Sequence, residues 1–239
     1  MDDERNIAFY RNVVKFTNKQ NAISDKAFVS NMDIFYRMQI EFENRGFLLF
    51  VKPSDKNTYK ERLGKADRGK LIQKANVSIG KLDYQIVNYS DICIPLEKLL
   101  QVFLAMMKTG YFAFTKKNQI LKQNGEIFES YCLQIHNYLT IDNMIKLYYM
   151  YKKAEQERMQ SLDKRTPIPY YIIGFLGELI GNKSSENIQE KLNYIFGDNR
   201  IFVEAYKYLA AITKSYKRTY EKDIFPGDYN AMIKKPIDN

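Results

Sequence analysis

The sequence is short of several residue types that particular protein classes require. It has no tryptophan, one histidine, two cysteines, 11 glycines and 6 prolines among 239 residues. So little glycine and proline excludes a fibrous protein, and a content of 45% hydrophobic and 14% aromatic residues excludes a disordered one. The chain contains no apolar run near the ~18 residues that a membrane-spanning helix needs, so we expect no membrane partner.

The N-terminal residues and the cysteines bear on location. The charged residues between Met1 and Arg5 are unlike a secretory signal. Cys93 and Cys132 lie far apart in the sequence, and two thiols make no disulfide framework, which is typical of a reducing compartment. We therefore predict a cytoplasmic protein.

The single histidine, His136, limits the catalytic sites that the chain can build. Every Ser-His-Asp or Cys-His mechanism would have to use it, and a zinc site of His and Cys would have only Cys93, Cys132 and His136. Cys132 and His136 are four residues apart, so they share one side of a helix and could form a thiolate–imidazole pair. We favour a buried structural thiol beside an interfacial histidine, because free cysteine is among the residue types most often buried.

Motif searches add no reaction. The sequence contains neither a Gly-x4-Gly-Lys phosphate-binding loop nor a Gly-x-Gly-x-x-Gly turn. The Asp…Asp/Glu-x-Lys pattern of metal-dependent nucleases is missing from the strand-like stretches. We therefore assign no catalytic residue, no metal site and no cofactor, and we favour a protein that is not an enzyme. A nuclease that uses only carboxylates and lysine remains open.

Hydrophobic periodicity predicts a mainly α protein, a helical bundle with a small β element in the N-terminal third. The polar stretch 53–83 is the best boundary, which divides the chain into an α-rich region, 1–83, and a bundle, 84–239. Two short apolar runs, 47–51 and 84–89, are predicted strands that could pair with each other. The predicted helices are 3–16, a turn ending at Phe28, 31–45 closed by Gly46, 91–110, 140–162, 167–180, 184–197 and 199–222. Asn31 or Asp33 is the predicted cap of the helix that ends at residue 45, and Thr140 caps the helix 140–162. Asp91 is predicted to start the helix 91–110, with Pro95 in its first turn.

The positive charge is concentrated rather than spread. The formal net charge is +9, and the stretches 55–81, 108–123 and 207–222 carry +5, +4 and +4, so the remainder is slightly acidic. The first two stretches are predicted loops and the third a helix end. Such clusters favour binding to a phosphate backbone, because each neutralised phosphate releases a counterion. The predicted nucleic-acid-binding residues are Arg62, Arg68, Lys116, Lys117, Lys122, Lys214, Lys217 and Arg218.

Aromatic residues lie among these charges and could stack on bases. The alternative is that the basic stretches form an ordinary surface that faces solvent or another protein. Net charge bears on the partners of a protein and not on its fold. The apolar positions of 199–222 are spaced alternately by four and three residues, which indicates a helix packed along its length and allows a homo-oligomer. The aromatic residues in question are Tyr59, Tyr111, Phe112, Tyr216 and Tyr220.

One segment resembles a known family. Thr17-Asn18-Lys19-Gln20-Asn21 is followed by Asp25, by Asn31, and by a helix that ends at Arg45-Gly46-Phe47 before an apolar run to Lys52. This pattern resembles the abortive infection phage resistance (AIPR) family of prokaryotes over roughly residues 1–110. The signature residues are Thr17, Asn18, Gln20 and Asn21.

The resemblance implies a place within a longer protein. Members of the family are generally longer and have an upstream, nuclease-like region with no counterpart in this sequence. The chain therefore resembles the C-terminal half of such a protein, and no catalytic residue carries over. The signature amides could satisfy buried backbone groups or contact base edges, and we favour the structural role.

These observations predict a non-catalytic helical binding module of a prokaryotic phage-defence protein. Its expected partner is DNA, RNA or another protein. The alternative is a metal-dependent nuclease or another toxic effector that acts in abortive infection.

Overall fold

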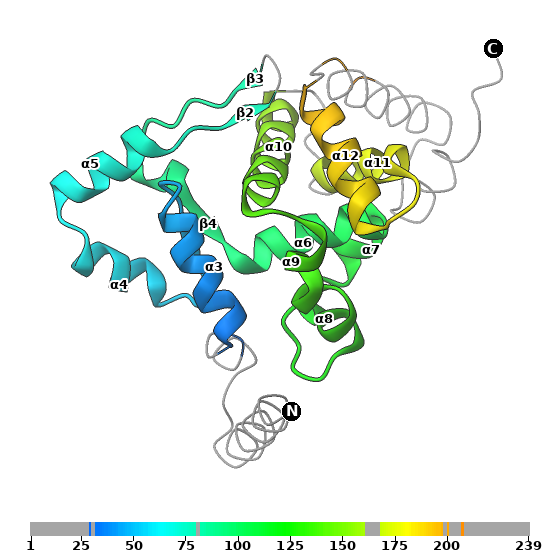
Figure 1. The fold of residues 1–239 in the computed structure, drawn as a ribbon, viewed down its shortest axis with the longest axis horizontal. Helices are drawn as coiled ribbons and strands as arrows, with labels where there is room; N and C mark the ends of the chain where they lie inside the picture. Colours follow the sequence, from blue (N-terminus) through cyan, green and yellow to red (C-terminus); the bar gives the residue numbers. More distant parts are fainter. Residues whose placement is uncertain are drawn as a thin grey trace.

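The computed structural model describes residue 29 and residues 32–79, 82–160, 168–197, 200 and 207. These residues form a mainly helical fold with two small two-stranded sheets, which confirms the predicted fold class (Figure 1). The predicted helix 3–16, the turn ending at Phe28, the family signature and, except for residues 200 and 207, the predicted helix 199–222 lie outside the described residues. The α-helices are α3 (Asp33–Glu43), α4 (Asp55–Arg62), α5 (Lys65–Lys74), α6 (Leu96–Met107), α7 (Gly110–Thr115), α8 (Glu126–Ser130), α9 (Ile135–Tyr138), α10 (Ile141–Gln160), α11 (Ile168–Ile180) and α12 (Ser185–Gly197).

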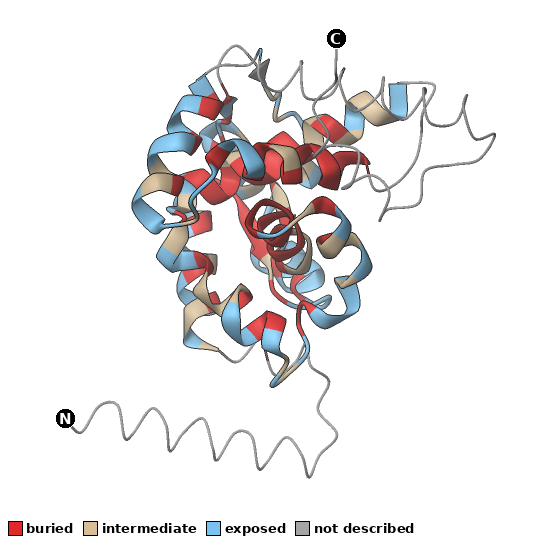
Figure 2. Cartoon of the chain, turned by 90° about the vertical axis from the view of Figure 1, so that its right-hand side faces the viewer, coloured by how far each residue is buried: buried red, intermediate tan, exposed pale blue. Residues whose placement is uncertain are grey.

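The centre of the bundle is α11, which packs against α6, α7 and α10. Its residues are buried on nearly every side, as its continuous apolar sequence predicts, and Gly181 with φ +71° follows its last turn. Glycines let the backbones meet: a Cβ at Gly177 would lie 2.1 Å from the carbonyl oxygen of Met106 in α6. Buried positions gather around these helices, with exposed positions outside them (Figure 2).

The helix α3 follows its predicted pattern closely. Phe35, Met38 and Phe42 form its buried stripe. Gly46 has φ +86°, and the N–H groups of Gly46 and Phe47 donate to the carbonyls of Glu43 and Phe42 at 2.9 Å. These two bonds are those of a Schellman motif, which satisfies the last carbonyls of the helix. The cap at the start differs from the prediction, because Met32 precedes the helix and makes no side-chain cap bond.

The strand pairing differs from the prediction. β1 (Leu48–Phe50) pairs in parallel with β4 (Cys93–Pro95), and residues 84–88 form no strand. The predicted second strand was wrong because Asp91 turns the chain there: its Oδ2 accepts from the N–H groups of Val87 and Asn88 at 3.1 and 2.8 Å. A short 3-10 helix, η1 (Tyr89–Ile92), follows, in a capping box formed with Asn88.

The predicted helix 91–110 is likewise shorter than expected. Pro95 keeps an extended conformation as the last residue of β4, so α6 begins at Leu96. At the other end α6 stops at Met107, and the Thr109 hydroxyl accepts from the N–H of Phe112 at 3.0 Å. That bond caps a further helix, so Gly110 begins α7 instead of ending α6.

The two polar stretches predicted as loops are mostly helical. Residues 53–83 form α4, α5 and a hairpin of β2 (Ser78–Ile79) and β3 (Leu82–Asp83). Residues 108–123 form α7 and the 3-10 helix η2 (Lys117–Gln119). Outside these stretches, a further 3-10 helix, η3 (Cys132–Gln134), precedes α9. The prediction was wrong because α4 and α5 have almost no apolar face: α5 buries no residue at all.

Strand pairing and core packing both cross residue 83, where the division into two regions stays a prediction. β1 lies before it and β4 after it, and their parallel pairing extends over three residues of each strand. Buried side chains on both sides join one hydrophobic core. In the part of the chain that the structure describes, none of the helices combines the length and apolarity required to cross a bilayer.

Candidate nucleic-acid interface

The helices α4 and α5, here called the arm, project at one end of the described fold, away from α7, α11 and α12 (Figure 1). A buried carboxylate anchors the start of the arm. Asp55 Oδ2 accepts from the N–H groups of Val51 and Lys52 at 2.8 and 3.0 Å, and from Gln39 Nε2 at 3.2 Å. The carboxylate of Asp55, the first acidic residue of the arm, is therefore hydrogen-bonded mainly to buried backbone groups. It offsets little of the positive charge at the surface.

The exposed face of the arm is rich in uncompensated lysine. Lys70 lies 3.6 Å from Asp67 in an exposed pair, which contributes little to stability. Lys56 and Lys60 are both exposed and stand one turn apart, an arrangement that destabilises a helix by like-charge repulsion. Within the described ranges, four exposed lysines of the arm have no salt bridge: Lys56, Lys60, Lys65 and Lys74.

The two predicted arginines of the arm, Arg62 and Arg68, lie over tyrosine rings. The guanidinium of Arg62 is 4.9 Å from the ring centre of Tyr59, and that of Arg68 is 5.4 Å from the ring centre of Tyr89. Arg62 Nη2 also contacts Glu43 Oε2 at 2.5 Å, a bond that raises the pKa of the arginine. Arg68 Nε donates to the Leu63 carbonyl at 3.0 Å. Both guanidinium groups are thus held in place, and Arg62 is partly neutralised.

The expectation that Tyr59 stacks on bases was wrong. Its side chain is 8% exposed, because it stacks on Phe50 with ring centres 5.7 Å apart and also lies under Arg62. Burial raises the pKa of its hydroxyl to about 12. The arm therefore presents charges rather than open aromatic faces.

The second basic stretch lies elsewhere. Lys117 and Lys122 are exposed and Lys116 is half-buried, around η2 at the end of α7. Figure 1 places α7 on the opposite side of the bundle from the arm, so the structure does not bring these lysines together with Arg62 and Arg68. Tyr111 on α7 is 36% exposed. The remaining predicted residues, Lys214, Lys217 and Arg218, lie outside the described residues.

The cysteines match the structural interpretation. Cys132 is fully buried, and burial raises the pKa of its thiol to about 12, whereas His136 is exposed on α9. The thiol of Cys93 donates to the Tyr89 carbonyl at 3.1 Å, and burial raises its pKa to about 11. Both thiols are therefore protonated at neutral pH. Over the described ranges, no three His, Cys, Asp or Glu side chains gather as a metal site would require.

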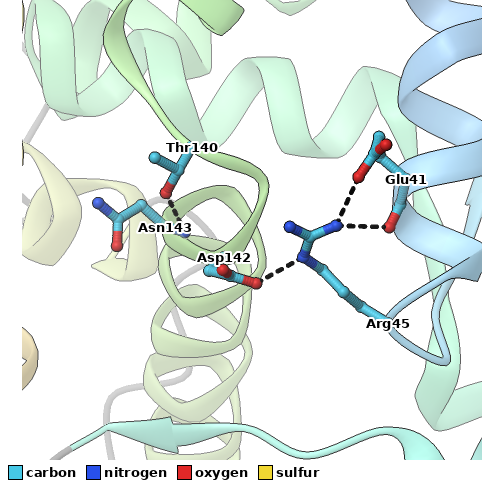
Figure 3. Close-up of polar contacts among 5 residues, drawn as sticks. All are labelled: Glu41, Arg45, Thr140, Asp142 and Asn143. Carbon is cyan, nitrogen blue, oxygen red and sulfur yellow. Dashed lines mark hydrogen bonds and ion pairs between the residues drawn. The ribbon is translucent and has the colours of Figure 1, made fainter.

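Sequence reasoning missed the polar contacts that position the N-terminal helices. Arg45, at the end of α3, reaches Asp142 in the first turn of α10, with Nε 2.6 Å from Oδ1 (Figure 3). Its Nη1 donates to the Glu41 carboxylate at 2.7 Å and to the Glu41 carbonyl at 3.0 Å. Asp142 is 97 residues from Arg45 in the chain, so no local pattern could reveal the pair.

The start of α10 is itself fixed by side chains. The Thr140 hydroxyl accepts from the N–H of Asn143 at 3.2 Å, which confirms the predicted cap (Figure 3). The Asn143 amide is buried and donates to Gln189 of α12 at 2.7 Å. Arg45 therefore attaches α3 to a helix end that is already tied to α12.

Comparisons with known proteins place the chain in a family but add no relative. The family model described as AIPR protein matches residues 3–224, so the resemblance seen over roughly residues 1–110 extends over most of the chain. No curated protein and no solved structure matches the sequence.

Proposed function

The chain belongs to the AIPR protein family, and from this premise we propose that it is a non-catalytic module that contacts nucleic acid through the arm. Membership indicates a role in abortive infection phage defence. The binding partner is part of the proposal, and the charges of the arm support it.

The observation that carries the proposal is a polar helix pair kept at the edge of the fold. α5 buries no residue, and the only buried residues of α4 are Asp55 and Tyr59. Helices of this kind gain little stability from core packing. Their residue composition is therefore not constrained by the core and can be suited to contacts at the surface. Their exposed lysines without salt bridges, such as Lys56 and Lys60, supply the charge that a phosphate backbone requires.

The arm is suited to backbone contact without base recognition. Tyr59 is covered, and no other aromatic residue belongs to α4 or α5. Phosphate contacts fix the register of a protein on a duplex but carry no sequence information. We therefore expect the arm to bind duplexes of unrelated sequence with equal affinity, and to lose affinity steeply with salt.

The test is fluorescence anisotropy with labelled DNA and RNA duplexes at several salt concentrations. The variant Lys56→Gln/Lys60→Gln/Lys65→Gln should bind more weakly. The slope of log K against log salt should fall by ~0.9 for every lysine that contacts a B-DNA phosphate. The unfolding temperature should be unchanged or slightly higher, since these side chains are exposed and the variant removes the repulsion between Lys56 and Lys60.

The matched control is Lys116→Gln/Lys117→Gln/Lys122→Gln, which removes the same charge at the opposite side of the bundle. Under the proposal it keeps most of the affinity and the salt slope of the unmodified chain. Equal losses in the two variants would mean that net charge alone matters. Binding that ignores both salt and the arm variant would refute the proposal.

A further inference from the structure

A hollow of about 490 Å³ opens where the β2–β3 hairpin meets α10 and α12. Its size lies within the ~300–1,000 Å³ of small-ligand sites. Three segments far apart in the sequence form it, namely the chain after α5, the second turn of α10 and the last turn of α12. The lining residues are Asn76, Ser78, Lys146, Asn193, Phe196 and Gly197.

Among the residues that the structure describes, the lining combines two carboxamides, a hydroxyl and one ammonium, without an acidic side chain. The Lys146 ammonium lies 5.7 Å from the ring centre of Phe196, so its position is set by a cation–π contact. Within the described part of the chain, Lys146 has no salt bridge, and the side chains of Asn76 and Asn193 have no hydrogen bond. Asn76 and Asn193 are exposed and Lys146 is half-buried, so these three lining side chains are open to a ligand in the hollow.

The end of α12 adds acceptors to these donors. The last carbonyls of a helix have no intrahelical partner and carry the negative end of its dipole. Asn193, Phe196 and Gly197 all belong to the final turn of α12. A ligand that fits must hence accept from Lys146 and also donate to carbonyl groups, which disfavours a bare anion such as phosphate.

We propose that this hollow binds the base of a nucleotide, with guanine preferred. A nucleobase is planar and presents donors and acceptors along one edge, as a lining of carboxamides, ammonium and carbonyls requires. Lysine is a common donor to guanine O6 and N7, while the N–H groups of guanine can donate to the helix carbonyls.

The proposal for the hollow is independent of the proposal that the arm binds nucleic acid, since it can be tested with free mononucleotides. The experiment records ¹H–¹⁵N spectra of the full chain during titration with GMP, AMP, CMP and UMP, and with ribose 5-phosphate. GMP should shift the amide signals of Asn76, Lys146 and Asn193 and bind most tightly. Ribose 5-phosphate should produce no saturable shift.

Two variants and a matched control test the assignment of the residues. Lys146→Met and Asn193→Leu should each weaken GMP binding about tenfold, the loss expected for one good contact to a base edge. Lys191→Met removes a charge from the exposed side of the same helix α12 and should leave binding unchanged.

The failure of this proposal is distinct from failure of the arm. The variant Lys56→Gln/Lys60→Gln/Lys65→Gln should bind GMP normally. The proposal is overturned if millimolar GMP causes no shift, if ribose 5-phosphate binds as tightly as GMP, or if Asn193→Leu, whose position is exposed, keeps full affinity.

Discussion

The helices α11 and α5 show two ways of belonging to one fold. α11 is buried on nearly all sides and meets α6 and α7 at backbone distance through Gly174 and Gly177. α5 buries none of its residues and is held at its ends. Packing therefore determines the sequence of α11, whereas α5 is constrained mainly by what its surface contacts.

The end of α5 shows how little holds it. The last turn of α5 passes close to Gly46 in the turn after α3, where a Cβ would lie 2.6 Å from the nitrogen of Ala75. Arg68 lies over Tyr89 of η1, and Leu71 is only half-buried. A glycine, a cation–π contact and a few partly buried side chains thus replace the broad apolar interface of α11.

Overfilling the interface of α11 should give the largest effect. In Gly177→Ala the new Cβ would lie 2.1 Å from the Met106 carbonyl oxygen, which is a backbone atom and cannot rotate away as a side chain could. We expect the free energy of unfolding to fall by about 3 kcal/mol or more. Urea denaturation followed by circular dichroism measures this free energy. If it falls no more than for an alanine substitution at an exposed position, α6 and α11 can move apart at little energetic cost, which contradicts the prediction.

Removing the anchor of the arm should have the next largest effect. Asp55→Ala leaves the N–H groups of Val51 and Lys52 without their acceptor, while Gln39 Nε2 keeps its bond to the Leu49 carbonyl. We expect a loss of about 2–3 kcal/mol, since one of these donors is buried. Asp67→Asn, at an exposed position of α5, is the control.

This variant also tests whether the arm is a separate unit. Hydrogen exchange should accelerate in β1 and the arm and remain slow in α11. Uniform acceleration throughout the molecule would instead mean that the arm and the bundle unfold together.

The helices found by periodicity and those that were missed differ in their burial. The sequence predicted α3, α10, α11 and α12 because their apolar residues repeat along one face or fill the helix. It missed α4 and α5 because a helix without a buried stripe has no hydrophobic period. The pairing of β1 with β4 was missed because Pro95 reads as the first turn of a helix and Asp91 as its cap.

The basic residues of the candidate interface could be identified from the sequence, but their separation in space into two groups could not. Lys116 and Arg62 look equivalent in the chain, whereas Lys116 follows α7 and Arg62 belongs to α4, and these two helices lie on opposite sides of the bundle (Figure 1). Contact of Arg62 with Glu43 depends on tertiary structure, as does the pair of Arg45 with Asp142. Distances of this kind follow from the fold and not from local spacing.

The smallest effect should have the opposite sign. A Cβ at Gly69, in the middle of α5, would meet no atom within 4 Å. Gly69→Ala should therefore raise the stability of the helix by about 0.5–1 kcal/mol, because alanine has less freedom in the unfolded chain. Thermal unfolding of this variant beside Gly177→Ala compares the same change in both regions, and destabilisation at Gly69 would reveal a contact of the arm.

The parallel pairing of β1 with β4 gives the arm a particular topology. Parallel neighbours cannot be joined by a tight turn, so the chain between them must leave the sheet and return. The arm and the hairpin are that excursion, and both of its ends are fixed side by side in the core. The segment is a closed loop, called here the handle, that is attached to the core at both ends and not at one end only. A single break between α4 and α5 would free neither half, and residues could be added at Gly64 without changing where the handle is attached.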